Sequence, residues 1–178
     1  LEYRGYDSAG VVFFSNNNLQ LIKAVGKLVN LDKKIEDLKS DAGKVAIAHT
    51  RWATHGVPSE ENAHPHSALG GKLMIVHNGI IENYRELKNQ LNDVKFISQT
   101  DTEVLAHLIG KHYNGDLRQA VETALAHIRG TYGLVVTHSD HPDKLVAARM
   151  GSPLVVGFGE GEYYIASDAT PILAYTNQ

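Results

Sequence analysis

Short apolar runs separated by turn residues recur along this chain, and two neighbouring amphipathic helices divide the early runs from the late ones. Runs of this length, bounded by glycine, asparagine and serine, are typical of buried strands. The expected strands are residues 11–14, 19–25, 44–48 and 73–76, then 134–136, 144–147, 154–156 and 163–166. The first two read as a hairpin and the last four as an antiparallel meander. This order predicts sheets layered with helices.

Capping residues and glycines set the expected helix boundaries. Asn83 and Glu86 have the spacing of a capping box, as do Thr100 and Glu103. Helices are expected from Asn30 to near Gly43, from about Asn83, from Thr100 to Gly115 and from Asp116 to Gly130. Residues 57–71 have two prolines and no period, so a long loop is expected there.

The composition excludes several classes of protein. The net charge is −3 and the basic residues are scattered, so we expect no nucleic-acid partner. No apolar run approaches the ~20 residues of a membrane helix, and no secretory leader is visible, so a soluble cytoplasmic protein is expected. Residues 1–178 correspond to one domain. They contain no cysteine, which excludes disulfides, thiolate metal sites and a cysteine nucleophile among them.

Polar side chains are densest in residues 49–56, His-Thr-Arg-Trp-Ala-Thr-His-Gly, directly after a predicted strand. Ends of strands are common places for binding groups. The forked guanidinium of Arg51, beside Thr54 and His55, suits a bidentate carboxylate, although a salt bridge would also explain it. Trp52 is the only tryptophan. It is either a core anchor or a mobile gate over a pocket.

Asn78, Gly79 and Asp101 each have a structural and a functional interpretation. Asn-Gly between apolar runs is typical of a type I′ hairpin turn. Because a capped helix follows rather than a returning strand, the Asn78 amide and the Gly79 N–H could instead donate hydrogen bonds to a developing oxyanion. Asp101 is explained by the dipole of its predicted helix, or by a role as counter-ion for a substrate ammonium group.

Histidines close in sequence raise the question of a metal site. His49, His55, His64 and His66 are candidates, but no ligands follow the spacing of known zinc sites, so no metal is expected. A cationic fork, two neutral donors and a counter-anion together describe a pocket for an amino acid whose side-chain carbonyl is attacked. Glutamine fits that description.

Four ordered motifs resemble the glutaminase domains of the glucosamine-6-phosphate synthases, over essentially the whole chain. They are Leu-Glu-Tyr-Arg-Gly-Tyr-Asp-Ser-Ala-Gly at residues 1–10, the octet at 49–56, Val-His-Asn-Gly-Ile-Ile-Glu-Asn at 76–83 and Gln-Thr-Asp-Thr-Glu-Val at 99–104. The resemblance implies an α+β N-terminal-nucleophile hydrolase fold with four layers, αββα, in which two antiparallel sheets lie between helix layers. It implies glutamine amide hydrolysis by an N-terminal cysteine, without a cofactor.

The resemblance also assigns roles. Arg51 holds the substrate carboxylate, Thr54 and His55 line the same site, and Trp52 lies on the loop that closes it. The oxyanion donors are Asn78 and Gly79, and Asp101 binds the α-ammonium group.

Family members begin with the cysteine, a strand and a helix before the counterpart of Leu1. The chain is therefore expected to be a glutaminase domain truncated at both ends, or part of a longer chain, and inactive alone. Its expected partners are glutamine or glutamate, a sugar-isomerase domain of the parent chain that makes glucosamine 6-phosphate, and a second copy in a homodimer. The alternative is a non-catalytic module that binds glutamine or glutamate.

Overall fold

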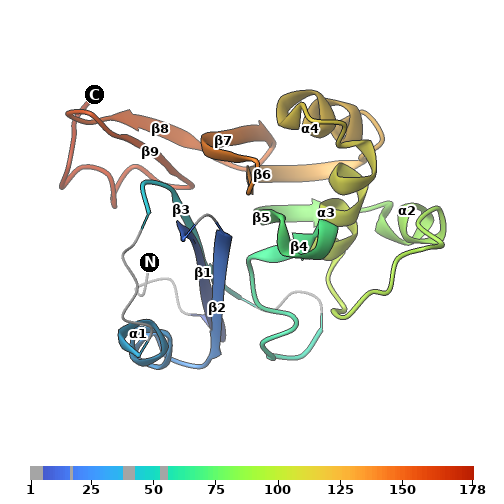
Figure 1. Ribbon diagram of the computed structural model, residues 1–178, viewed down its shortest axis with the longest axis horizontal. Helices are drawn as coiled ribbons and strands as arrows, with labels where there is room; N and C mark the ends of the chain where they lie inside the picture. The colour runs from blue at the N-terminus through green and yellow to red at the C-terminus, as the bar shows by residue number, and fades with distance from the viewer. Residues whose placement is uncertain (1–5, 17, 38–42, 53–55) are drawn as a thin grey trace.

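Two antiparallel sheets pack face to face between layers of helix in the computed structural model, which describes residues 6–16, 18–37, 43–52 and 56–178 (Figure 1). The first sheet has the order β2-β1-β3, with β1 at Ser8–Ser15, β2 at Asn18–Val25 and β3 at Ala46–Arg51. The second has the order β4-β5-β6-β7, with β4 at His66–Ala68, β5 at Leu73–Ile81, β6 at Gly130–His138 and β7 at His141–Met150. A further antiparallel pair joins β8 at Val155–Phe158 to β9 at Tyr163–Ala166.

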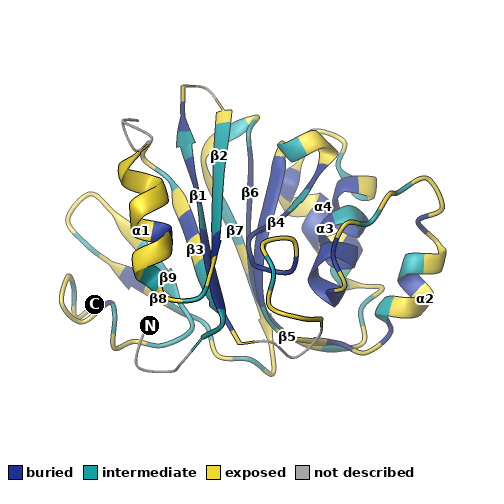
Figure 2. Cartoon of the chain, turned by 90° about the horizontal axis from the view of Figure 1, so that it is seen from below, coloured by how far each residue is buried: buried dark blue, intermediate teal, exposed yellow. Residues whose placement is uncertain are grey.

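Helices cover the outer faces of both large sheets (Figure 2). The covering helices are α1 at Leu28–Glu36, α3 at Asp101–His112 and α4 at Leu117–Leu125, whereas α2 at Tyr84–Asn89 packs beside α3. Helix α1 lies against the first sheet, whereas α3 and α4 lie against the second. The layers therefore follow the order αββα, as the family resemblance implies. No helix in the described part of the chain is both long and apolar enough to cross a membrane.

Side chains along β5 alternate between two hydrophobic cores, one between the second sheet and its helices and one between the two sheets. Leu73, Ile75 and Ile81 are buried in the cluster that contains the α3 and α4 side chains. Met74 and Val76 are buried with residues of the first sheet instead. Because successive strand residues point to opposite faces, this two-residue period directs position 78 toward the first sheet and position 77 toward α3.

Several expected boundaries are wrong. Strand β3 continues through Arg51, so the polar octet begins inside the strand rather than after it. The expected loop at residues 57–71 contains β4 and a short 3-10 turn at Leu69–Gly71. Asn78 and Gly79 lie within β5 and pair with β6, so the type I′ turn is excluded. The four late strands exist, but the described residues form two separate pairs, β6 with β7 and β8 with β9, rather than one meander.

Two of the predicted helix caps are confirmed and two are wrong. Thr100 and Asp116 accept hydrogen bonds from the third residue of their helices, Glu103 and Gln119, and both caps are confirmed. Asn30 lies inside α1, which begins at Leu28. Asn83 precedes α2 but makes no side-chain cap. Helix α3 ends at His112 and α4 at Leu125, before the glycines expected to end them, and Gly130 instead begins β6.

Candidate active site

A cavity of about 370 Å³ lies between the two large sheets. Arg51 lines it from the end of β3, and Trp52 follows directly. Asn78 and Gly79 line it from β5, and Asp101 lines it from the first position of α3. The structure thus brings together five of the seven residues predicted from the sequence. Thr54 and His55 lie outside the described residues.

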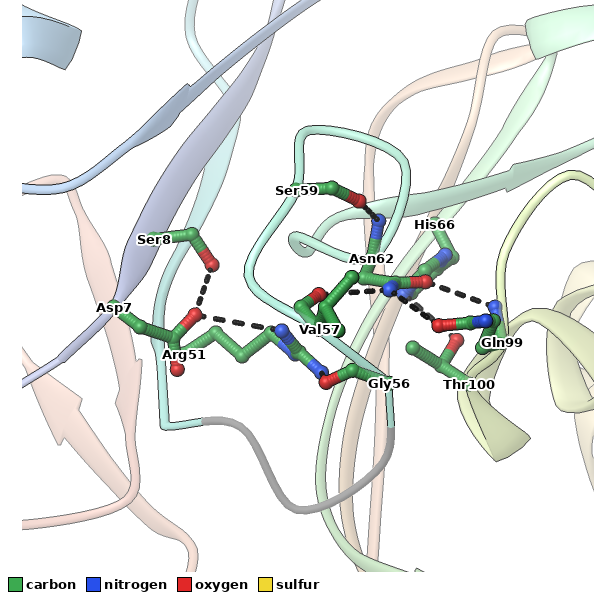
Figure 3. Close-up of polar contacts among 10 residues, drawn as sticks. All are labelled: Asp7, Ser8, Arg51, Gly56, Val57, Ser59, Asn62, His66, Gln99 and Thr100. Atoms are coloured by element: carbon green, nitrogen blue, oxygen red, sulfur yellow. Dashed lines mark hydrogen bonds and ion pairs between the residues drawn. The ribbon is translucent and has the colours of Figure 1, made fainter.

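Arg51 is only 4% exposed, so its charge lies at the cavity wall rather than at the surface. Its Nη1 lies 3.4 Å from Oδ1 of Asp7, and Nη2 donates to the carbonyl of Gly56 at 3.2 Å (Figure 3). The backbone N–H of Asp7 in turn donates to the carbonyl of Arg51 at 2.9 Å. These contacts hold the fork in place, which favours binding of a planar anion.

Trp52 is 67% exposed, so its interpretation as a core anchor is wrong. An exposed indole beside a cavity is compatible with a gating role, which stays a prediction.

Asn78 points toward the first sheet, where Nε2 of His49 lies 2.7 Å from its Oδ1. The next residue, Gly79, has a φ of 133°. A Cβ there would lie 2.1 Å from the carbonyl oxygen of Thr131, so the strand can pass only with glycine at this position. The two candidate donors are thereby adjacent on one strand at the cavity wall.

Asp101 is 6% exposed, and its Oδ2 accepts from the backbone N–H of Ile81 at 2.8 Å. The Thr100 cap places the carboxylate in the first turn of α3, where the helix dipole favours negative charge. His77 lies between this helix and the sheet, with Nδ1 3.0 Å from the hydroxyl of Thr102. Burial lowers the pKa of His77, opposed by the negative charge of Asp101.

Two buried side chains that the sequence did not predict as site residues support this arrangement. Asn62 accepts from the backbone N–H of Gln99 at 2.8 Å and donates to the carbonyl of Val57 at 2.8 Å (Figure 3). Glu103 accepts from the backbone N–H groups of Ile97 and Ser98 at 2.8 and 2.7 Å. Together they fix the segment that leads into α3 and Asp101. The capping-box spacing pointed to Glu103, but nothing local in the sequence pointed to Asn62.

His55 lies outside the described residues, which contain no group of three or more potential metal ligands. Burial instead lowers the pKa of His49 to about 4 and holds the pKa values of His64 and His66 well below the ordinary value. The three rings are therefore neutral at pH 7.

Comparison with known proteins identifies relatives of this chain. The family described as "Glutamine amidotransferase domain" matches residues 49–174. The chain is 52% identical over 178 residues to the glutamine–fructose-6-phosphate aminotransferase (isomerizing) of Clostridium tetani, covering 99% of this chain and 29% of that protein. It is 50% identical over 180 residues to the protein of the same name from Thermus thermophilus, covering 100% of this chain and 30% of that protein. The chain thus spans less than a third of the length of these relatives.

Solved structures share the architecture. The glutamine phosphoribosylpyrophosphate amidotransferase from B. subtilis, complexed with ADP and GMP, superposes with a TM-score of 0.82 at 29% identity, covering 98% of this chain and 39% of that one. A glutamine aminotransferase class-II domain protein from Silicibacter pomeroyi superposes with a TM-score of 0.62 over 88% of this chain and 78% of that one. At 16% identity, the second likeness shows the fold alone.

Proposed function

Because the chain belongs to the glutamine amidotransferase domain family, we propose that its cavity binds glutamine and is where the side-chain amide is hydrolysed to glutamate and ammonia. The αββα arrangement is the N-terminal-nucleophile hydrolase fold that the sequence resemblance implies. One observation carries the proposal: a buried cation, a buried anion and two neutral donors line a single cavity.

Each end of glutamine has a matching group. The guanidinium of Arg51 suits the α-carboxylate through paired charge-assisted hydrogen bonds. The carboxylate of Asp101 suits the α-ammonium group. These contacts fix the backbone of the substrate and leave its side-chain carbonyl for Asn78 and Gly79, whose N–H groups would stabilise negative charge on the oxygen.

The nucleophile must come from outside these 178 residues, which contain no cysteine. In the proposed mechanism the thiol of an N-terminal cysteine adds to the amide carbon, with its own α-amino group accepting the thiol proton. The oxyanion then collapses, the C–N bond breaks and the protonated nitrogen leaves as ammonia. Water resolves the thioester to glutamate and regenerates the thiol. Thr54 and His55 are proposed to line the same site.

The parent protein is proposed to transfer this ammonia to fructose 6-phosphate, giving glucosamine 6-phosphate. Relatives named glutamine–fructose-6-phosphate aminotransferase (isomerizing) are about 50% identical to this chain and extend well beyond it. We propose that a sugar-isomerase domain of the same polypeptide receives the ammonia, and that the parent is a cytoplasmic homodimer.

The test is glutamine-dependent ammonia release from three proteins. The first is residues 1–178, the second is the same chain preceded by the cysteine-first segment of the family, and the third carries alanine in place of that cysteine. Release by the second protein alone is expected. Release by residues 1–178 would contradict the assignment of the nucleophile.

The second candidate is a non-catalytic module that binds glutamine or glutamate, because the buried cation and anion that line the cavity would suit the ends of either amino acid without any reaction. Calorimetry with glutamate would show binding under either function. A folded extended protein that binds glutamate but releases no ammonia would favour the binding module.

A further inference from the structure

A hydrogen bond from His49 fixes the orientation of the Asn78 side chain. Nε2 of His49 lies 2.7 Å from Oδ1 of Asn78. A carbonyl oxygen can only accept, so Nε2 carries the hydrogen and donates it. The amino group of Asn78 is then turned away from the imidazole. No described residue accepts from that amino group, so both of its N–H bonds are available to a ligand in the cavity.

Packing holds the His49 ring in this position. The ring of His64 lies 4.2 Å from it, centroid to centroid, at an angle of 42°. Gly10 pairs with His49 across the sheet, and a Cβ at Gly10 would lie 2.2 Å from the backbone oxygen of His64. The close approach of His64 therefore depends on glycine at that position. His66 packs on His64 at 4.8 Å, and its Nε2 lies 3.0 Å from the hydroxyl of Thr100, the cap of α3.

The surroundings of the other ring nitrogen select the same tautomer. Nδ1 of His49 is buried and has no hydrogen-bond partner in the described part of the chain. With the hydrogen on Nδ1, a buried donor would be left without an acceptor, which is rarer than an unpaired lone pair. Nε2 would then accept from Asn78 and turn Oδ1 into the cavity. Burial also lowers the pKa of His49 to about 4, which excludes the doubly protonated ring at neutral pH.

We propose that His49 is a positioning residue: it turns the amino group of Asn78, rather than its carbonyl oxygen, toward the glutamine carbonyl. The inference rests on the proposed function. When the thiol adds to the amide carbon, the oxygen gains negative charge. An N–H donor beside it stabilises that charge, and a carbonyl oxygen in the same place would repel it. His49 thus acts on the reaction only through Asn78.

Two substitutions in the cysteine-extended protein separate the donor from the ring. In His49→Gln the amide nitrogen replaces Nε2 as a donor, so kcat is expected to stay within a few-fold of the original. His49→Leu removes the donor, and kcat is expected to fall toward the ~100-fold loss that accompanies a missing oxyanion donor. KM should change little in both, because Arg51 and Asp101 hold the ends of the substrate.

A double-mutant cycle tests whether the effect passes through Asn78. Asn78→Ala removes the donor itself, so adding His49→Leu should cost no further activity. His138→Leu is the matched control, because His138, like His49, has a buried ring nitrogen with no partner among the described residues, but it does not line the cavity. It should lower stability without changing kcat. Retention of kcat in His49→Leu, or multiplied losses in the double variant, would overturn the proposal.

A spectroscopic measurement is independent of activity. Long-range ¹H–¹⁵N spectra of residues 1–178 should show the hydrogen of His49 on Nε2. Finding it on Nδ1 would overturn the proposed orientation of Asn78. If the hydrogen is on Nε2 but the extended protein releases no ammonia, the proposed function fails and the catalytic role of His49 fails with it, whereas the orientation of Asn78 stands.

Discussion

The carboxylate of Asp101 accepts a hydrogen bond from the backbone N–H of Ile81, with 2.8 Å between oxygen and nitrogen. Asp101 is the first residue of α3 and Ile81 is the last residue of β5. The bond therefore fixes the start of the helix to the strand that carries Asn78 and Gly79. Among the described residues, the other carboxylate oxygen is contacted only by the hydroxyl of Thr102, at 3.4 Å. One oxygen thus has a structural role, and the charge of the group remains available for a ligand.

Replacing Asp101 in two ways should separate these roles. In Asp101→Asn the side-chain oxygen still accepts from Ile81, so stability should change little, but loss of the charge should weaken glutamate binding by ~1.5–3 kcal/mol. Asp101→Ala should weaken binding as well and also cost ~1–3 kcal/mol of stability, because the buried N–H of Ile81 loses its acceptor. Calorimetry and urea unfolding measure the two quantities. Equal loss of stability in both variants would contradict the assignment of a structural role to the oxygen that accepts from Ile81 and a binding role to the charge.

Arg51→Ala should impair the use of glutamine in the parent enzyme while sparing the use of free ammonia. Truncating one side of a buried charge pair with a substrate carboxylate costs ~2–5 kcal/mol in kcat/KM. Arg51→Lys should recover only part of this, because an ammonium cannot form the paired contacts of the guanidinium. The measurement compares kcat/KM for the two nitrogen sources. Equal losses with both would show that Arg51 does not hold glutamine.

The end of β5 shows where local patterns mislead. The sequence predicted a strand only for residues 73–76 and left Asn78-Gly79 open between a hairpin turn and a pair of oxyanion donors. In the structure β5 pairs with β6 from Leu73 through Ile81. Pairing with a strand some fifty residues away overrides the local turn preference, and a single sequence does not show that partner. Both residues nevertheless line the cavity, because strand alternation directs position 78 inward, and their function as oxyanion donors stays a prediction.

The capping errors have a similar cause. Asn30 and Asn83 were predicted to cap helices on local spacing alone. The side chain of Asn30 instead donates to the carbonyl of Val25, and that of Asn83 bonds to the backbone of His127 and Arg129. In each case a backbone group outside the helix binds the asparagine amide that would otherwise cap the helix. Thr100 and Asp116 were predicted correctly: each side chain accepts from the third residue of the helix that follows, although the Thr100 hydroxyl also contacts His66.

Glu103→Gln should lower the free energy of unfolding by ~1–3 kcal/mol. Both carboxylate oxygens of Glu103 accept from backbone N–H groups, and in glutamine one of these oxygens becomes an NH₂ group that cannot accept, so one buried backbone donor loses its partner. Glu103 is buried and accepts from Ile97 and Ser98. Glu122→Gln is the control, since Glu122 forms an exposed pair with Arg118 and such pairs contribute ~0.2–1 kcal/mol. Urea unfolding compares the two. A similar small effect for both would show that the Glu103 contacts do not order the segment before α3.

Stability should fall between pH 7 and pH 5. His49, His64 and His66 have pKa values lowered by burial from 6.5, that of His49 to about 4. As the pH drops below about 6.5, the unfolded chain binds protons that the folded chain does not, so the free energy of unfolding decreases. Each histidine contributes up to ~1.4 kcal/mol per pH unit. Above that range their contribution is complete and constant.

Urea unfolding at several pH values measures this slope. His49→Gln should reduce it by the share of one histidine, because glutamine does not titrate. A stability that is constant from pH 7 to pH 5 would mean that the three rings accept protons in the folded state.

Gly79→Ala should destabilise the chain far more than Gly161→Ala. Both glycines have positive φ, 133° and 74°, so an alanine in either place carries a conformational cost of ~1–2 kcal/mol. No described atom lies within 4 Å of a Cβ at Gly161, so the conformational cost of the backbone should be the whole loss of stability there. At Gly79 the Cβ would overlap the carbonyl oxygen of Thr131 at 2.1 Å, so β5 and β6 must separate where the Asn78 donor is held. Urea unfolding of both variants measures the difference in stability. Equal loss of stability in the two variants would show that β5 can move away from β6 without cost. The close pairing of these strands would then not be what holds the Asn78 donor in place.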